Sequence, residues 1–353
     1  MKILIITLTG IGGALMFSPA LKLLRNELPN STIDMLVMIK SARDIYDKNP
    51  YINKVIFFDF LKEGSLPSLK FVLSLRKKYD ISINVYPSNR KEYNIINFLI
   101  GAKKRVAVKY LRKNSQNLGF LNNITVEEND SLHNVQTNIK LVERLLNRSF
   151  GEEPPLEFPF SKEDISFSED YLKRLNVSED DLVVGFHPGC ATLKNHIKRR
   201  WEPGKFAGLA KLLIENNNAK ILLFGGPEED KLKENILSRI NSTSASIVRT
   251  DGLKSSAAIM KRCNLFITND SSLMHVASAL KLNVIAIIGP TNANYIYPWK
   301  TEHKIVTLNL DCSPCFFYSP KPLKCYRDDV LFKCIKELSV DMVYNAAKDL
   351  LNK

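Results

Sequence analysis

Short runs of apolar residues alternate with amphipathic stretches along the first half of the chain. The runs KILIIT, TIDMLVMI, KVIFFDF, ISINVY and RVAVKY are rich in Ile, Val and Leu, which is typical of strands buried on both faces of a sheet. The stretches ALMFSPALKLLRNEL and SLKFVLSLRKKY have the apolar spacing of helices. Strands that alternate with helices predict a parallel sheet with helices on both faces.

A second series of the same kind follows a polar stretch between about residues 147 and 181, in which Pro154, Pro155 and Pro159 indicate a linker. Its strand-like runs are LVVGFHPG, KILLFGGP, ASIVRT, LFITND and VIAIIGP. Helical patterns in GKFAGLAKLLIEN, SSAAIMKRC and SSLMHVASALK separate several of these runs. The two series therefore share one architecture, although no stretch of sequence is repeated.

These patterns predict an α/β chain of two Rossmann-like domains, each a doubly wound parallel sheet, over residues 1–160 and 161–337. A final amphipathic helix is predicted within residues 338–353. Ligands of open α/β sheets bind beyond the carboxyl ends of the strands, so we expect the two domains to face a central cleft. Candidate functional residues should therefore lie in the loops that follow strands.

Composition narrows the class of protein. The chain has 353 residues, of which 45% are hydrophobic and 25% charged, so a disordered chain, a collagen-like repeat and a small disulfide scaffold are excluded. The net charge of +13 favours acidic partners, such as phosphorylated small molecules or an anionic membrane surface. Aromatic residues do not interleave with the basic clusters, so nucleic acid is not expected as a partner.

Two features bear on the compartment. The uncharged stretch from Ile3 to Leu21 could be a signal peptide or a membrane span, but its glycines and proline favour a buried strand, a loop and a helix. We therefore expect a soluble, cytoplasmic protein. Four of the six cysteines crowd into the tail, where a structural zinc site, disulfide bonds and free thiols all remain open: Cys312, Cys315, Cys325 and Cys334.

The first loop after a strand contains Gly10, Gly12 and Gly13 and leads into a helix. Glycine lets a backbone approach a ligand closely, and the N–H groups at a helix start can bind an anion. The dinucleotide-binding pattern is incomplete because Leu15 occupies its third glycine position, and Lys40 stands where an acidic ribose ligand is expected. NAD binding is therefore disfavoured, and a tight strand–helix turn is the alternative to an anion site.

Two loops of the second series carry charge. After the run LVVGFHPG, which ends at Gly189, the cations Arg199 and Arg200 precede a helix; arginine donates paired hydrogen bonds that suit a diphosphate. After KILLF, Glu228 and Glu229 follow two glycines and could accept hydrogen bonds from a ribose or a base. A solvated basic loop and a capped turn are the respective alternatives.

A third loop of the second series has the most specific pattern, TNDSSLMH. The strand ends in Asp270, Ser271 and Ser272, and His275 lies one helical turn further on the same side. A single residue would suffice to cap the helix. Four polar side chains at the carboxyl end of a strand therefore predict a site for a polar ligand.

These four loops in this order, with the tail CSPC…C…C, resemble glycosyltransferase family 9, the group of the ADP-heptose:lipopolysaccharide heptosyltransferases. The resemblance implies a GT-B fold. It also implies inverting transfer of a sugar such as heptose from a nucleoside-diphosphate sugar, with an ADP-sugar expected, to a lipopolysaccharide-type or other cell-surface glycan. No metal or other cofactor is implied. The final helix, residues 338–353, would return towards the N-terminal domain.

The same resemblance assigns roles to the loops of the second series. Arg199 would lie at the donor diphosphate with Arg200 beside it. Glu228 or Glu229 would lie near the nucleoside. The segment with the polar residues Asp270, Ser271, Ser272 and His275 would contact the sugar and the diphosphate.

The chain departs from the family at Gly13, where the family has an aspartate that is read as the general base. Inverting transfer needs a base to remove the proton of the acceptor hydroxyl, and glycine cannot do so. Glu92, after the run ISINVY, is our candidate replacement. A phosphate of the acceptor could instead serve as base, or the chain could be a weakly active or non-catalytic nucleotide-sugar-binding protein. A nucleotide-sugar epimerase on the same fold is a further alternative.

The first series should hold the acceptor. Basic residues are frequent there and suggest an anionic glycan or glycolipid, with peripheral contact at the inner face of the membrane. A solvated basic face is the alternative. The residues concerned are Arg90, Lys91, Lys103, Lys104, Arg105, Lys109, Arg112 and Lys113.

Overall fold

A computed structural model describes residues 1–318 and 321–352 of the chain. By its internal contacts the chain divides into two compact units. Unit 1 comprises Met1–Pro159 together with Tyr318 from late in the chain. Unit 2 comprises Phe160–Phe317 and the chain from Lys321 onward. Among the described residues, no helix combines the length and the apolar character that crossing a bilayer requires.

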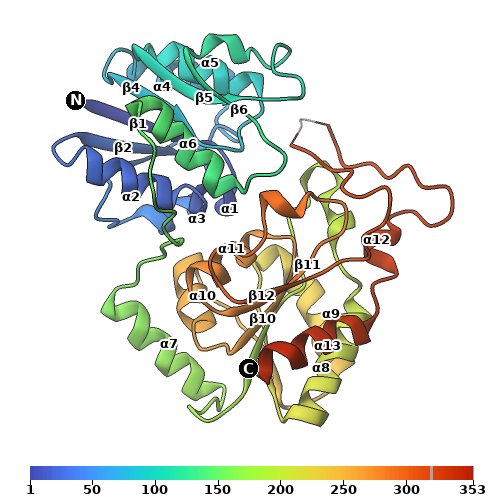
Figure 1. The fold of residues 1–353 in the computed structure, drawn as a ribbon. Helices are drawn as coiled ribbons and strands as arrows, with labels where there is room; N and C mark the ends of the chain where they lie inside the picture. The colour runs from blue at the N-terminus through green and yellow to red at the C-terminus, as the bar shows by residue number, and fades with distance from the viewer. Residues whose placement is uncertain (319–320, 353) are drawn as a thin grey trace. The chain divides into compact units, whose positions relative to one another are not determined.

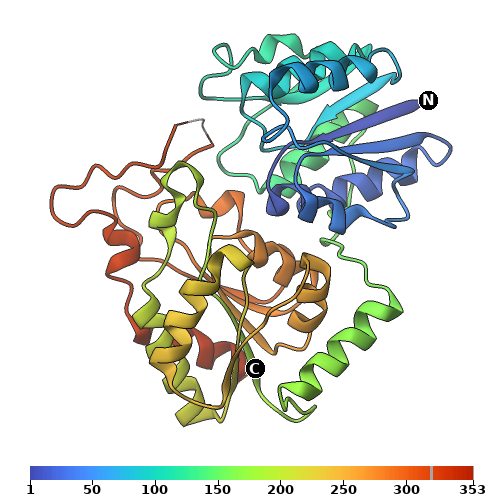
Figure 2. The same ribbon diagram turned by 180° about the vertical axis from the view of Figure 1, so that it is seen from behind.

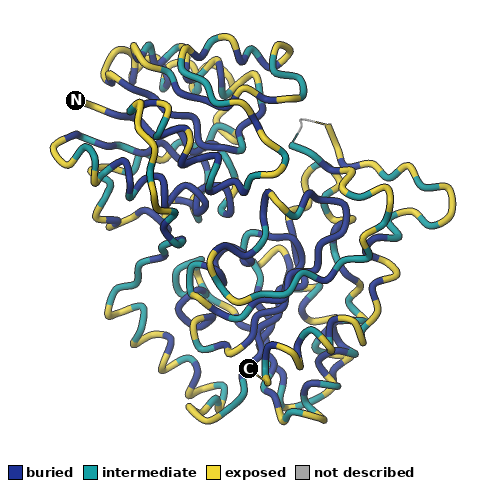
Figure 3. Tube along the Cα trace, viewed as in Figure 1, coloured by how far each residue is buried: buried dark blue, intermediate teal, exposed yellow. Residues whose placement is uncertain are grey.

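Unit 1 is built on a six-stranded parallel sheet in the order β3-β2-β1-β4-β5-β6 (Figure 1). Every pair of neighbouring strands is parallel, and β1 lies between β2 and β4. The central strands are dark blue in Figure 3 because their Ile, Val and Leu side chains are buried on both faces. The strands are β1 (Lys2–Thr7), β2 (Thr32–Val37), β3 (Lys54–Phe57), β4 (Ile81–Asn84), β5 (Lys104–Lys109) and β6 (Ile124–Glu127).

Helices cover both faces of this sheet. α2 packs against α6, and α4 packs against α5; Figures 1 and 2 show these two pairs on opposite faces. The core beneath α4 and α5 contains Leu4, Ile6, Val72 and Ile100. The helices are α1 (Ile11–Leu15), α2 (Ser18–Glu27), α3 (Lys40–Tyr46), α4 (Ser65–Ser74), α5 (Lys91–Ile100) and α6 (Asn134–Leu146), with the 3-10 turn η1 (Gly119–Leu121).

Unit 2 repeats the architecture. Its parallel sheet has the order β12-β11-β10-β7-β8-β9. Counted from its own first strand β7, unit 2 has the order 6-5-4-1-2-3, which is the order of unit 1 in reverse. The strands are β7 (Val183–His187), β8 (Lys220–Leu223), β9 (Ala245–Ile247), β10 (Leu265–Asn269), β11 (Asn283–Ile287) and β12 (His303–Val306).

The helices of unit 2 also form two layers. α8 packs against α9 and α13 over a core that includes Phe206, Ile236 and Val343, while α7 packs against α10. α13 also contacts β12, so its packing is within unit 2; a return towards the N-terminal domain stays a prediction. The helices are α7 (Lys162–Arg174), α8 (Pro203–Asn217), α9 (Asp230–Ile240), α10 (Leu253–Met260), α11 (Ser272–Ala279), α12 (Lys333–Lys336) and α13 (Val340–Leu351), and the 3-10 turns are η2 (Leu193–Arg199), η3 (Pro227–Glu229) and η4 (Ala293–Tyr295).

One predicted helix is interrupted. The stretch ALMFSPALKLLRNEL indicates a single helix, but α1 ends at Leu15 and α2 begins at Ser18. Pro19 lies in the first turn of α2. Proline lacks an N–H group and its ring clashes with the carbonyl four residues earlier, so it is accommodated only where a new helix starts. The prediction of one continuous helix is therefore wrong.

The repeated strand order determines where ligands can bind. In each sheet the first three strands run from the centre toward one edge, and the next three run from the centre toward the other edge. The reversal falls between β1 and β4 in unit 1 and between β7 and β10 in unit 2. Loops diverge at such a point and leave room at the carboxyl ends of the two strands.

Candidate functional site

The polar residues predicted for unit 2 gather where β7 and β10 end. These strands are paired, with Thr268 opposite His187. The chain leaves β7 through Pro188 and Gly189 and leaves β10 through Asp270 into α11. Both loops thus start at the reversal point of the sheet, where the strand order predicts a ligand site.

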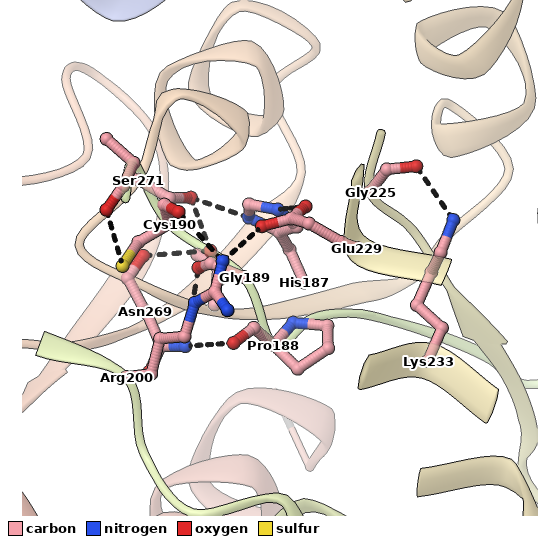
Figure 4. A network of polar contacts seen from close by, with 12 residues as sticks. His187, Pro188, Gly189, Cys190, Arg200, Gly225, Glu229, Lys233, Asn269 and Ser271 are labelled. Carbon is pink, nitrogen blue, oxygen red and sulfur yellow. Dashed lines mark hydrogen bonds and ion pairs between the residues drawn. The ribbon is translucent and has the colours of Figure 1, made fainter. Parts of the chain in front are cut away.

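His187, at the end of β7, contacts Glu229 of η3 and Ser271 at the start of α11 (Figure 4). Its Nε2 lies 2.9 Å from Glu229 Oε2 and its Nδ1 lies 2.7 Å from Ser271 Oγ, and the residue is buried. A carboxylate only accepts hydrogen bonds, so Nε2–H donates to Glu229. In the neutral ring, Nδ1 then accepts from the hydroxyl of Ser271. The imidazole therefore holds β7, η3 and the start of α11 in one arrangement.

Glu229 is the anionic centre of this arrangement. Arg200 Nη2 donates to its Oε1 at 3.0 Å and also to the carbonyl oxygen of Cys190 at 3.0 Å. Burial raises the pKa of Glu229, but the hydrogen bond from His187 and the charge of Arg200 outweigh burial, so the pKa lies below its usual value. The carboxylate is therefore charged at neutral pH.

Two glycines make room for this carboxylate. A Cβ atom at Gly189 would lie 1.6 Å from Glu229 Oε1, and one at Gly225 would lie 2.6 Å from Oε2. Gly225 also has a φ of +147°, a conformation that side chains disfavour. The buried Lys233 donates to the Gly225 carbonyl oxygen at 2.9 Å (Figure 4). The glycines after the two strands therefore serve close packing of Glu229.

A second ion pair lies beside the first. Arg199 Nη1 donates to Asp270 Oδ2 at 2.5 Å, and the hydroxyl of Thr291 donates to the same oxygen at 2.6 Å. The Arg199 guanidinium lies 5.6 Å from the ring centre of Phe316 and 3.1 Å, through Nη2, from His196 Nδ1. Arg199 is therefore oriented on three sides. We call His187, Arg199, Arg200, Glu229, Asp270 and Ser271 the unit 2 polar cluster.

Four buried nitrogens in or beside the cluster have no hydrogen-bond partner among the described residues: Nε of Arg199, Nε of Arg200, Nε2 of His196 and Nδ1 of His275. Burial lowers the pKa of His275 to about 4, and burial together with the Arg199 charge lowers that of His196 to about 4. Both imidazoles are therefore neutral at neutral pH. Buried polar atoms without partners are costly, so a ligand that accepts hydrogen bonds would satisfy the N–H groups of this set, which include both arginine Nε atoms.

The structure brings together most of the predicted donor residues, with three differences. His275 is buried one turn inside α11. Ser272 is half-buried at the first position of that helix. Glu228 is exposed, whereas Glu229 is buried and bound to His187 and Arg200. Of the two glutamates, Glu228 is thus the one whose carboxylate is open to a ligand.

Sequence reasoning missed three residues that shape the site. His187 was noted only as part of a loop motif, and Thr291 and Asn269 were not singled out. Asn269 Oδ1 accepts from the Trp201 N–H at 2.9 Å, and its Nδ2 donates to the Pro188 carbonyl oxygen at 2.7 Å. Their shared signal is position, since each ends a strand or follows one at the carboxyl edge of the sheet.

In the glycine loop of unit 1, a side chain of the loop itself, that of Thr9, fills the space beside Gly13. Gly12 and Gly13 are buried in α1, and Gly10 precedes that helix and is exposed. A Cβ atom at Gly13 would lie 2.0 Å from Thr9 Oγ1 and 3.0 Å from Thr9 Cβ. Thr9 therefore occupies the space that an aspartate at residue 13 would need. Glu92 lies in the first turn of α5, is exposed, and makes no hydrogen bond or ion pair with any described residue.

The basic residues between 103 and 113 do not form one group. Lys103 precedes β5 and Lys113 follows it, so the length of this six-residue strand, at about 3.3 Å per residue, separates the two residues. Lys109 pairs with Glu127 at 2.8 Å, and Arg112 pairs with Asp130 at 2.7 Å. Two of these basic residues therefore form ion pairs within unit 1, and an anionic acceptor for this segment stays a prediction.

The four tail cysteines differ in burial. Cys312 and Cys315 are exposed, Cys325 is half-buried and Cys334 is buried, and none of the four forms a disulfide bond with a described residue. Within residues 1–318 and 321–352, no group of three or more His, Cys, Asp or Glu side chains is arranged to hold a metal ion.

Relatives of the chain are heptosyltransferases by name. A family model described as glycosyltransferase family 9 (heptosyltransferase) matches residues 68–326. Lipooligosaccharide heptosyltransferase 2 of Campylobacter jejuni subsp. jejuni serotype O:2 is 26% identical over 357 residues, which cover 99% of this chain and 98% of that protein. Lipopolysaccharide heptosyltransferase 2 of Escherichia coli K12 is 25% identical over 321 residues, covering 87% of this chain and 88% of that protein.

Solved structures share the fold. The structure of Escherichia coli ADP-heptose lps heptosyltransferase II matches with a TM-score of 0.76 and 20% identity over 100% of this chain and 99% of that one. An Escherichia coli heptosyltransferase solved with ADP-2-deoxy-2-fluoro heptose matches with a TM-score of 0.69 and 16% identity over 99% of each chain. The expected GT-B type of fold, with two doubly wound parallel sheets, is thereby confirmed. Since the family model matches most of its length, the chain belongs to glycosyltransferase family 9 and is a glycosyltransferase.

Proposed function

We propose that unit 2 binds a nucleoside-diphosphate sugar, ADP-heptose in the first place, and that the chain transfers its sugar with inversion to a lipopolysaccharide-type acceptor. The observation that carries the proposal is the set of unpartnered nitrogens at Arg199, Arg200, His196 and His275. A diphosphate accepts many hydrogen bonds, so it suits this set. The relatives named above support heptose as the sugar and ADP as its carrier.

In the proposed reaction the acceptor oxygen forms a bond to the anomeric carbon while the bond from that carbon to the diphosphate oxygen breaks. Negative charge then grows on the departing nucleoside diphosphate. Arg199 and Arg200 would stabilise it, and because ion pairs with Asp270 and Glu229 already orient them, little reorganisation is needed. Glu228 would accept hydrogen bonds from the nucleoside, and Ser272 would donate to the sugar or the diphosphate.

The acceptor would bind at the reversal point of unit 1, between β1 and β4. Thr7 Oγ1 and Asn84 Oδ1 end these two strands, are buried and have no partner among the described residues. Glu92 follows β4 and begins α5 with a free carboxylate. We propose that Glu92 takes the proton of the acceptor hydroxyl. Glu128, another carboxylate of this unit, is less suited because Tyr86 and the Leu111 N–H occupy both its oxygens.

Donor binding is tested by calorimetric titration of the protein with ADP-, GDP-, UDP- and dTDP-sugars. We expect selective binding of an ADP-sugar, lost or weakened by about 100-fold in Arg199→Ala because a charge-assisted contact to the diphosphate is removed. Arg249→Ala is the matched control, since Arg249 forms an exposed ion pair in the same unit. Binding of no nucleotide sugar, or equal binding by both variants, would contradict the proposal.

The proposed base is tested with Glu92→Gln, which keeps the shape of the side chain and removes its basicity. We expect kcat to fall by about 100-fold or more while donor affinity is unchanged. Glu63→Gln is the control, because Glu63 is an exposed carboxylate near the carboxyl edge of the same sheet. Full activity of Glu92→Gln would transfer the role to another group, such as a phosphate of the acceptor.

Gly13 favours a second candidate function, nucleotide-sugar binding without turnover. Thr9 fills the space of the absent aspartate, so the loop is adapted to glycine. Release of free ADP from ADP-heptose in the presence of a lipopolysaccharide core acceptor distinguishes the two functions. Turnover that stops in Arg199→Ala would exclude the binding-only function.

We further propose that the acceptor is an anionic glycolipid and that the chain acts at the cytoplasmic face of the membrane. The excess of basic residues supports an anionic partner. The relatives named for lipopolysaccharide and lipooligosaccharide support a lipid-linked glycan as the acceptor.

A further inference from the structure

The outer face of α4 is apolar and uncovered. Leu66, Leu69 and Leu73 recur at helical spacing and are 80%, 44% and 42% exposed. The opposite face of the same helix packs into unit 1 through Phe71 and Val72. α4 is therefore apolar on both faces although it lies at the surface. Single exposed leucines are ordinary, but three on one helical face form a patch, which we call the leucine stripe.

The neighbouring helix also exposes apolar side chains. α5 packs against α4 and exposes Ile95 and Phe98. The guanidinium of Arg105 lies 5.5 Å from the ring centre of Phe98, so an apolar side chain and a cation occur together here. Exposed apolar side chains thus occur on both of these adjacent helices.

Cations gather where α4 and α5 end. The N–H of Lys77 donates to the carbonyl oxygen of Ile100 at 2.8 Å, and a Cβ atom at Gly101 would lie 3.7 Å from Arg76 Cγ. These contacts bring together two stretches that are separate in sequence. All five of their cations are exposed and have no ion pair among the described residues. We call them the basic cluster: Arg76, Lys77, Lys78, Lys103 and Lys104.

Charge along the chain is uneven in the same place. Residues 61–105 contain ten Lys and Arg but three Asp and Glu, whereas the rest of the chain contains 40 and 34. The segment that bears the leucine stripe and the basic cluster therefore carries more than half of the net charge of +13.

We propose that the leucine stripe and the basic cluster form a docking surface for an anionic lipid bilayer. Exposed leucines on a surface helix insert into the boundary between headgroups and acyl chains, and lysines beside them attract anionic headgroups. A protein partner would bury the leucines as well, but five unpaired cations at the end of the stripe match the uniform negative charge of a bilayer. The proposal builds on the lipid-linked acceptor proposed above, because docking would bring unit 1 to the lipids that carry it.

The test is sedimentation of the full-length protein with vesicles of phosphatidylcholine, with and without phosphatidylglycerol. We expect binding only when phosphatidylglycerol is present, and weaker binding at high salt because salt screens the lysines. Replacing Leu66, Leu69 and Leu73 by serine should weaken binding about tenfold or more, because insertion is lost. Replacing Lys77, Lys78 and Lys103 by glutamate should abolish it.

Matched controls separate docking from general charge and from folding. The triple change of Lys211, Lys231 and Lys261 to glutamate removes the same charge from exposed positions of unit 2 and should leave most binding intact. Each variant is also titrated with ADP-sugar, which unit 2 would bind without lipid. Retained ADP-sugar binding with lost vesicle binding supports docking. If the wild-type protein does not bind an ADP-sugar, the proposed function is overturned, whereas the vesicle result still stands.

Two results would overturn the docking surface. The first is vesicle binding that is equal in the wild-type protein and in the leucine and lysine variants. The second is self-association of the wild-type protein in analytical ultracentrifugation that the leucine variant loses, with no vesicle binding by either. The leucine stripe would then be a contact between two copies of the chain.

Discussion

At the scale of single residues, the charge of the buried Glu229 can be tested most directly. His187 and Arg200 stabilise the carboxylate in a buried place, and two glycines leave space for it. A carboxylate bound in this way contributes to folding only while it is charged. Measuring the free energy of unfolding at several pH values therefore separates the contribution of the charge from that of packing.

We predict that Glu229→Gln lowers the free energy of unfolding by roughly 1–3 kcal/mol at neutral pH, since a buried charge-assisted contact is lost. The folded pKa of Glu229 lies below the reference value of 4.5, so the contribution is complete above that pH and is lost as the pH falls through the folded pKa. Urea unfolding at several pH values measures the difference, which should shrink in acid.

Glu234→Gln is the control for this series. Glu234 pairs with Arg249 at 2.8 Å, but both side chains are more than half exposed, and exposed pairs contribute little. A pH-independent difference for Glu229→Gln would mean that packing rather than charge is responsible.

The loop at Gly13 yields a second residue-scale prediction. Gly13→Asp should destabilise unit 1 because its Cβ would lie 2.0 Å from Thr9 Oγ1, and overpacking of this kind costs about 1–3 kcal/mol. Thr9→Gly removes the obstructing side chain. In a double-mutant cycle we therefore expect Gly13→Asp to cost less when residue 9 is glycine. Additive thermal shifts would show that Thr9 does not determine the tolerance at residue 13.

At the scale of elements, the strands followed from sequence more fully than the helices did. Central strands such as β1 and β10 are continuous apolar runs because both their faces are buried, and that pattern is unambiguous. The edge strands β6 and β12 were not predicted, since they are short and half exposed. α7 lies in the stretch taken as a linker, because its exposed face makes it polar overall.

The site followed from sequence only where a motif marked it. Asp270 and Ser271 lie together in sequence, so their grouping was visible. The bridge from His187 to Glu229 joins segments that only the strand order brings together, and no local pattern reports it. The choice between Glu228 and Glu229 needed the packing of glycine against the carboxylate.

Asn269 connects the ends of elements, and its removal should be costly. Its side chain accepts from Trp201 and donates to the Pro188 carbonyl, so it joins the end of β10 to the loops before α8 and after β7. Asn269→Ala would leave both buried groups without partners, at about 1–3 kcal/mol each. We expect a lower urea midpoint by tryptophan fluorescence and weaker donor binding.

Asn235→Ala is the control, because Asn235 is exposed and accepts one hydrogen bond from Arg239. Unchanged stability of Asn269→Ala would mean that water replaces the amide in this place.

At the scale of the whole molecule, the two units can be followed separately. The chain has two tryptophans, Trp201 and Trp299, and both are buried in unit 2. Tryptophan fluorescence thus reports unit 2, while far-ultraviolet circular dichroism reports both units. An ADP-sugar at 100 times its Kd should stabilise the fluorescence transition by about 2.7 kcal/mol. Equal shifts by both methods would indicate that the units unfold as one.

The strand order also has a consequence in time. In unit 1, Ile3 pairs with Ile81, and in unit 2, Val184 pairs with Leu265, so each sheet joins its two halves only after the chain has made a long excursion. Contacts this distant in sequence are slow to form. All the strands of unit 1 precede unit 2 on the chain, so its sheet can assemble while the ribosome is still making unit 2. Tyr318, which packs on Tyr86 of unit 1, would arrive last, when the earlier strands have long been paired.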